Sequence, residues 1–112
     1  MLFVEYDGPA EVFTAARDAV RERVASVLRI APRDVIVRRW LYEGDYAGVE
    51  VWVELSSEEQ RYRYAQRLAE EITAALRPHT PEDIWVLFRI VPLDQAYLNG
   101  VPRRRDSMSL DD

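Results

Sequence analysis

Two adjacent arginines, Arg38 and Arg39, are the residues of this sequence that are best suited to bind an anion. An arginine side chain is a planar, permanently charged fork that can hold a carboxylate or a phosphate through two parallel hydrogen bonds. The pair could therefore clamp the carboxylate of a substrate. The alternative is structural, with Arg38 paired to a glutamate of a sheet and Arg39 at the sheet rim, and we favour it.

A second set of candidate residues lies in the stretch 49–55, VEVWVEL, where every second side chain is aliphatic. This alternation predicts a strand whose other face carries Glu50, Trp52 and Glu54. The two carboxylates stand ~13 Å apart along the strand, too far for a direct pair within one chain. Copies of the chain around a symmetry axis could gather like carboxylates about a cation, although salt bridges to arginine explain these residues more simply.

Composition limits the remaining chemistry. The 112 residues include no cysteine and one histidine, which excludes thiolate and multi-histidine metal sites within one chain, and we predict no metal and no cofactor. The formal net charge of −5 disfavours nucleic acid as a partner. No apolar run could span a membrane and the first residues do not resemble a secretory signal, so we expect a cytoplasmic protein without membrane association.

The hydrophobic pattern predicts four strands and two helices. We expect strands at residues 2–6, 35–42, 49–55 and 84–91, and helices at about 9–28 and 57–76. The spacing of Ser57 and Gln60, or that of Ser56 and Glu59, is that of a capping box and marks the start of the second helix. Asn99 and Gly100 form a strong hairpin signal, which predicts a short β-arm within residues 92–112.

The chain contains an internal repeat. Residues 32–37, PRDVIV, match residues 81–86, PEDIWV, and the order strand, helix, strand recurs around both. We therefore read residues 1–112 as a single α+β domain made of two β-α-β units, at 2–42 and 49–91. Two right-handed units side by side predict a four-stranded mixed sheet with both helices on one face.

The second face of this sheet is expected to lie between copies of the chain. An uncovered face rich in aromatic side chains would be an exposed apolar patch, and parallel strands are rarely left uncovered. Opposite charges on this face could pair with one another, because an unpaired buried charge is costly. The residues that we expect on this oligomer face are Glu5, Trp40, Glu50, Trp52, Glu54, Trp85 and Arg89.

The order of these predicted elements and their repeat resemble the tautomerase superfamily, which includes macrophage migration inhibitory factor. The resemblance rests on the duplicated β-α-β unit, on residues 32–37, and on the last predicted strand followed by Tyr97-Leu98-Asn99-Gly100. Residues 49–52, VEVW, through Gln60, with the Tyr-x-Asn-Gly ending, look like a bacterial family of unknown function within that superfamily. The resemblance implies a homotrimer with pockets near the N-terminus, at the borders between subunits.

The sequence departs from the superfamily at its catalytic residue. Activity there depends on an N-terminal proline whose amine acts as a base or nucleophile, whereas this chain has Leu2 at that position and no proline before Pro9. We therefore expect the pocket but not the proline-dependent tautomerase activity. The Met1 amine could act as a weaker base in that pocket, and Tyr97 and Asn99 could close the pocket of a neighbouring subunit. The simpler alternatives are an ordinary terminus for Met1 and a turn residue for Asn99.

Three functions remain open from the sequence. The first, which we favour, is a tautomerase-fold protein that binds a small molecule or a partner at subunit borders. The second is a divergent isomerase, with an oxo-acid held by Arg38 or Arg39 and another group as base. The third is a structural or interaction module. Whether the protein is an enzyme is not decided by the sequence.

Overall fold

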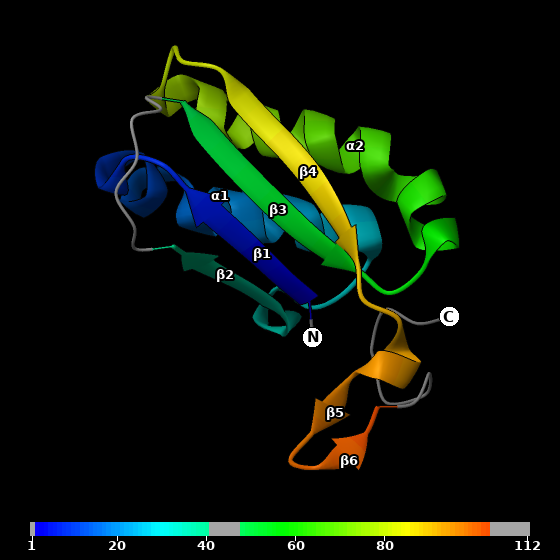
Figure 1. The fold of residues 1–112 in the computed structure, drawn as a ribbon. Coiled ribbons are helices and arrows are strands. Elements are labelled where there is room, and N and C mark those ends of the chain that lie inside the picture. Colours follow the sequence, from blue (N-terminus) through cyan, green and yellow to red (C-terminus); the bar gives the residue numbers. More distant parts are fainter. Residues whose placement is uncertain (1, 41–47, 104–112) are drawn as a thin grey trace.

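The structure is a computed structural model that describes residues 2–40 and 48–103. Figure 1 shows the arrangement of its elements. The first half contains β1 (Leu2–Asp7), α1 (Ala10–Leu28) and β2 (Val35–Arg39). The second half contains β3 (Val49–Leu55), α2 (Glu58–Leu76), β4 (Ile84–Ile90), β5 (Tyr97–Leu98) and β6 (Val101–Pro102).

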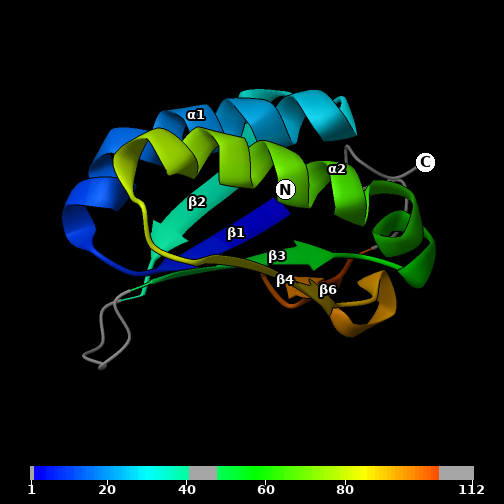
Figure 2. The same cartoon turned by 90° about the horizontal axis from the view of Figure 1, so that it is seen from above.

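The four long strands form one mixed sheet in the order β2-β1-β3-β4. The strand pairs β1–β2 and β3–β4 are parallel, one in each repeat, and β1–β3 is antiparallel at the centre. Both helices cover the same face of the sheet (Figure 2). The predicted α+β class, with two β-α-β units in a four-stranded mixed sheet and both helices on one face, is confirmed.

The core lies between this face and the helices. Alternate residues of the strands point into it, and Val4, Val49 and Val53 are completely buried there. Leu68 and Ile72 of α2 pack from the other side. Full burial of such a side chain stabilises the fold by roughly 1.5–3 kcal/mol relative to exposure, so the period-two pattern determines which face of each strand is covered. At the surface, Arg23 of α1 joins the two helices through an ion pair with Glu71 at 2.8 Å.

The ends of the helices follow local signals in the sequence. Ser57 caps α2, because its side-chain oxygen accepts a hydrogen bond from the Gln60 amide at 3.1 Å. The Gln60 side chain accepts in return from the amide of Ser56 at 2.9 Å, one residue earlier than in a standard capping box. The first helix begins at Ala10 rather than at the expected Pro9, which has an extended ψ of 138° and serves as the N-cap.

Two predicted strands are shorter than expected. The strand predicted at 35–42 ends at Arg39, and residues 41 and 42 lie outside the described part of the chain. The strand predicted at 84–91 ends at Ile90, although the amide of Val91 still donates to Leu55 at 2.8 Å. The partner strand β3 ends at Leu55, which is paired with Ile90, so β4 has no neighbour to continue along. In contrast, β1 continues to Asp7, and the Trp40 amide still donates to the Tyr6 carbonyl oxygen at 2.8 Å.

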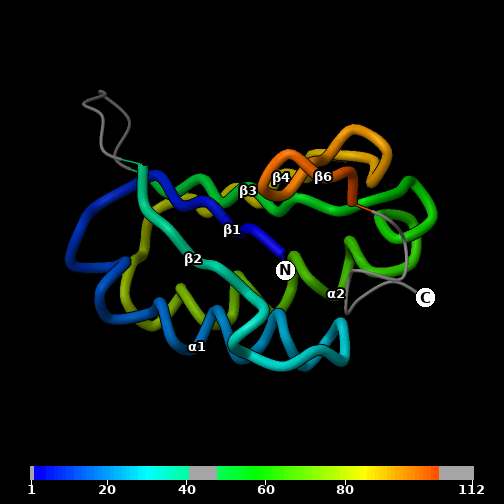
Figure 3. Tube along the Cα trace, turned by 90° about the horizontal axis from the view of Figure 1, so that it is seen from below, coloured from blue at the N-terminus to red at the C-terminus, as the bar shows by residue number. Residues whose placement is uncertain are grey.

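The chain after β4 forms the predicted β-arm. The turn between β5 and β6 has positive φ at Asn99 (55°) and at Gly100 (81°), which a tight two-residue hairpin requires and which Asn and Gly tolerate best. The arm lies beyond the end of β4, on the side of the sheet opposite to the helices (Figures 2 and 3). It therefore stands beside the end of the sheet at which β1 begins.

Candidate functional site

The sheet face opposite to the helices carries charged and aromatic side chains in register. Glu5 of β1 lies between Arg38 of β2 and Trp52 of β3. In the next row Glu50 pairs in register with Trp85 of β4. Trp40 and Trp85 remain 45% and 56% exposed in the single chain. The strand registers place these side chains on one face of the sheet. That other copies of the chain cover this face stays a prediction.

Glu5 is the centre of a charged cluster on this face. Its side chain is only 7% exposed, and both of its carboxylate oxygens accept hydrogen bonds from arginines. Arg38 donates to Oε2 from Nε at 3.0 Å and from Nη2 at 2.6 Å. Arg89, which lies 84 residues later in the chain, donates to Oε1 from Nη1 at 3.1 Å. The central position of β1 is what allows one carboxylate to reach arginines of both β2 and β4.

The electrostatics of this cluster keep the carboxylate ionised. Burial raises the pKa of the Glu5 carboxyl, but the hydrogen bonds and charges of Arg38 and Arg89 outweigh burial and hold that pKa below its ordinary value. Each arginine also stacks on an aromatic ring, Arg38 over Phe3 at 4.6 Å and Arg89 over Trp52 at 4.9 Å. The two guanidinium groups are thereby fixed by contacts within one chain.

The two candidate arginines are occupied by contacts that do not involve a pocket. Arg38 is bound to Glu5, as described above. Arg39 points to the other side of the strand and donates from Nε and Nη2 to the carbonyl oxygen of Gly8, at 3.3 Å each. This places Arg39 at the rim of the sheet, near the turn between β1 and α1.

A pocket of about 230 Å³ opens at the opposite end of β1. It lies where β1 begins, where β3 and β4 end, and where the arm folds back. The carboxyl ends of parallel strands are frequent ligand sites in sheets with crossover helices, and β3 and β4 contribute such ends here. The lining residues are Leu2, Phe3, Glu54, Leu55, Ser56, Val91, Leu93, Ala96, Tyr97, Leu98 and Arg103.

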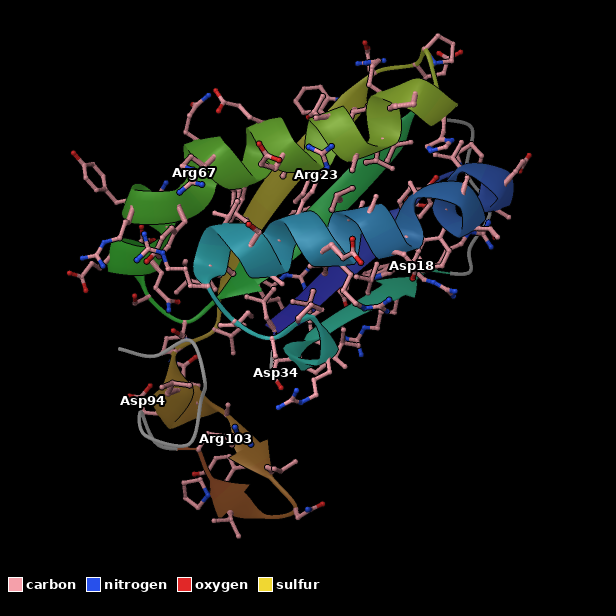
Figure 4. All side chains as sticks on the ribbon, turned by 180° about the vertical axis from the view of Figure 1, so that it is seen from behind. Asp18, Arg23, Asp34, Arg67, Asp94 and Arg103 are labelled. Carbon is pink, nitrogen blue, oxygen red and sulfur yellow. The ribbon has the colours of Figure 1, made fainter. Side chains whose placement is uncertain are left out.

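The polar part of this wall is small. It consists of the Glu54 carboxylate, Ser56, the Tyr97 hydroxyl and the Arg103 side chain, among leucine, valine and aromatic carbon. Ser56 donates its hydroxyl hydrogen to Gln60 at 2.6 Å. Arg103 lies in the arm together with Asp94, far from Arg23 and Arg67 on the helices (Figure 4). The arrangement suits a mainly apolar molecule that is oriented by few polar contacts.

The structure brings only some of the expected pocket residues to this site. Tyr97 lines it, whereas Asn99 lies in the turn of the arm and Arg38 and Arg39 lie elsewhere. Met1 lies outside the described residues. Glu54, which we expected on the oligomer face, also borders the pocket.

Sequence analysis missed the apolar part of the wall. Val91, Leu93 and Leu98 come from the segment after β4. Their signal is the set of apolar residues that recur after the last strand, in a segment that the sequence assigns to the arm alone. These residues alone do not predict a pocket, because the opposite wall is formed by β1 and β3, which lie far away in the sequence.

A second, smaller hollow of about 100 Å³ lies at the other end of the open face. Glu5, Asp7 and Glu50 border it, together with Trp40 and Trp52. Glu50 accepts a hydrogen bond from the Trp52 indole nitrogen at 3.3 Å. Within residues 2–40 and 48–103, no group of three or more His, Cys, Asp or Glu side chains has the arrangement to hold a metal ion. No helix in those residues is long and apolar enough to cross a membrane.

Comparison with known proteins identifies the fold. No model of a protein family matches the sequence, and no curated protein matches it. Among solved structures, a domain of unknown function (DUF1904) from Sebaldella termitidis aligns with a TM-score of 0.71 at 12% identity, over 91% of this chain and 99% of that one. A macrophage migration inhibitory factor-like protein from Entamoeba histolytica aligns with a TM-score of 0.69 at 8% identity, over 90% and 97%. The chain has a tautomerase-like fold.

A third structure adds an assembled relative of this fold. R7 fused 4-OT, an asymmetric trimer, aligns with a TM-score of 0.63 at 13% identity, over 89% of this chain and 94% of that one. The resemblance to the tautomerase superfamily, and to a family of unknown function, is therefore confirmed at the level of the tautomerase-like fold. At these identities the comparison extends to the fold alone.

Proposed function

We propose that this protein uses the tautomerase-like fold without a proline base, to bind a small, largely apolar molecule in the pocket at the start of β1. The observation that supports the proposal is the pocket itself, with about 230 Å³ enclosed by Leu2, Leu55, Leu98 and other mostly apolar residues. A concave, mainly apolar site with a few polar groups is the usual form of a small-molecule site.

The residues at this site argue against proline-type catalysis. Position 2 is Leu2, whose nitrogen is part of an ordinary peptide bond and whose side chain is 2% exposed in the core. A peptide nitrogen is not basic, so it cannot accept the proton that an N-terminal proline amine accepts. Within one chain, neither Arg38 nor Arg39 borders the pocket to hold an oxo-acid.

We further propose that the active form is a homotrimer, with other copies of the chain covering the open face of the sheet. The exposed Trp40 and Trp85 support this, because a monomer would leave both indole rings against water. The trimeric state of R7 fused 4-OT, which shares the fold, supports it as well. A monomeric mass by light scattering at micromolar concentration would refute the trimer. A cytoplasmic location remains the expectation of the sequence.

Titration with phenethyl alcohol, followed by two-dimensional NMR of the labelled protein, tests the pocket. We expect saturable shifts at the amides of Leu2, Leu55 and Leu98, which surround it. The substitution Ala96→Trp places a bulky ring in the wall and should abolish the shifts. Tyr62→Ala is the control, because Tyr62 is 88% exposed on α2 and its loss should change nothing. Absence of saturable binding, or binding that survives Ala96→Trp, would contradict the proposal.

An enzyme assay separates this function from the alternatives. Enol forms of phenylpyruvate and unsaturated oxo-acids are the substrates to test, and we expect no turnover above the buffer rate. Turnover that is lost in Arg38→Ala or Arg39→Ala would establish the divergent isomerase instead. A purely structural module would show neither turnover nor binding of a small molecule.

A further inference from the structure

Glu54 is the carboxylate in this pocket, and its surroundings differ from those of the other acids on the sheet. Its side chain is half-buried and forms part of the pocket wall. Glu5 is held by two arginines and Glu50 by the Trp52 indole. Across residues 2–40 and 48–103, Glu54 makes neither a hydrogen bond nor an ion pair.

The nearest arginine in the sheet is directed elsewhere. Arg89 faces Glu54 in the register of β3 and β4. However, Arg89 donates to Glu5 at 3.1 Å and its guanidinium group lies over the Trp52 ring at 4.9 Å. These two contacts draw the charge of Arg89 toward β1, and Arg89 makes no hydrogen bond or ion pair with Glu54.

The chemistry of an ionised carboxylate restricts what can bind beside it. Such a group only accepts hydrogen bonds, so its complement is a donor, and a cationic donor forms the stronger bond. Apolar walls weaken the competition from water and strengthen both the attraction of a cation and the repulsion of an anion. Tyr97, which borders the same pocket, offers an aromatic ring that also favours a cation over an anion.

We propose that the ligand of this pocket is a small primary amine with an apolar body, whose ammonium group is hydrogen-bonded to the Glu54 carboxylate. The apolar body packs against Leu2, Leu55 and Leu98, which line the same pocket. This inference rests on the proposed function, because it names the class of ligand for the same pocket. Arg103 carries the opposite charge in the wall, so an acidic ligand is the competing outcome to test.

Three probes with the same aromatic body test the inference by calorimetry or NMR titration: phenethylamine, phenethyl alcohol and phenylacetate. We expect the amine to bind at least about tenfold more tightly than the alcohol, and phenylacetate to bind most weakly. Glu54→Gln should remove the preference for the amine while the affinity for the alcohol stays the same. Glu50→Gln is the matched control, because Glu50 lies on the same face of β3 but not in the pocket wall, and it should keep the preference.

The outcomes separate this inference from the proposed function. If phenethyl alcohol binds as tightly as phenethylamine, or phenylacetate binds most tightly, the amine inference is overturned while the pocket remains a binding site. Retention of the preference in Glu54→Gln would overturn it equally. If none of the three probes binds, the proposed function itself fails.

Discussion

Glu5 and Glu54 are carboxylates on the same face of neighbouring strands, but their contacts differ. Glu5 is central on β1, where arginines from both flanking sides reach it. Glu54 is next to the last residue of β3, where the sheet ends and the pocket begins. The first carboxylate is fully satisfied by the fold, whereas the second faces a space that the fold leaves open. The difference predicts a loss of stability when Glu5 is altered and, under the proposal above, a loss of ligand preference when Glu54 is altered.

The largest expected effect comes from removing the charge of the satisfied carboxylate. Glu5→Gln should lower the free energy of unfolding by roughly 2–3 kcal/mol, because an amide cannot accept charge-assisted bonds from both arginines. Because the Arg38 side chain is half-exposed, water can solvate it in the variant. The loss of stability is therefore smaller than for a fully buried ion pair. Urea denaturation followed by circular dichroism measures it. A loss below about 0.5 kcal/mol, the usual scale of a surface substitution, would show that the cluster is not structural.

A smaller effect should appear on acidification. Arg38 and Arg89 hold the pKa of the Glu5 carboxyl below its ordinary value in the folded chain, so ionisation of this carboxyl stabilises the folded state. This contribution is complete above the unfolded pKa and is lost as the pH falls through the lowered folded pKa. We expect the wild type to lose more stability than Glu5→Gln between neutral pH and about pH 3, measured by urea denaturation at each pH. Equal losses in the two proteins would assign the acid sensitivity to other carboxylates.

The smallest expected effect is that of Glu54→Gln on stability. Because Glu54 has no hydrogen bond or ion pair within the described chain, the substitution should change the free energy of unfolding by less than about 0.5 kcal/mol. Thermal and urea unfolding of Glu54→Gln, measured together with Glu5→Gln, compare the two variants directly. A destabilisation similar to that of Glu5→Gln would indicate that Glu54 is a structural residue, for instance in contact with another copy of the chain.

Much of the fold could be predicted from local patterns. The alternation in residues 49–55 placed the valines in the core and Glu50, Trp52 and Glu54 on the other face, because successive side chains of a strand point to opposite sides. Asn99 and Gly100 specified the turn of the arm through their tolerance of positive φ. The ends of the strands were less predictable, because how far a strand is paired depends on the neighbouring strand as well as on its own residues.

The candidate site was less accessible to such patterns. Arg38 could form an ion pair with Glu5, Glu50 or Glu54, and the sequence around Arg38 does not select among them. The structure selects Glu5 because β1 and β2 are paired with these two residues in register. The pocket unites residues from β1, from the end of β3 and from the segment after β4, which lie far apart along the chain.

The sequence by itself determined the two repeats, the face that each strand buries and the absence of a proline at position 2, since these depend on residue type and spacing alone. Only the tertiary structure decided which carboxylate is neutralised and which is left beside an open pocket. The reason is physical: hydrogen bonds and ion pairs act over a few ångströms, so their partners depend on strand order and register. Glu5 and Glu54 look equivalent in the alternating pattern of the chain, but the sheet pairs Glu5 with two arginines and leaves Glu54 in the wall of a pocket.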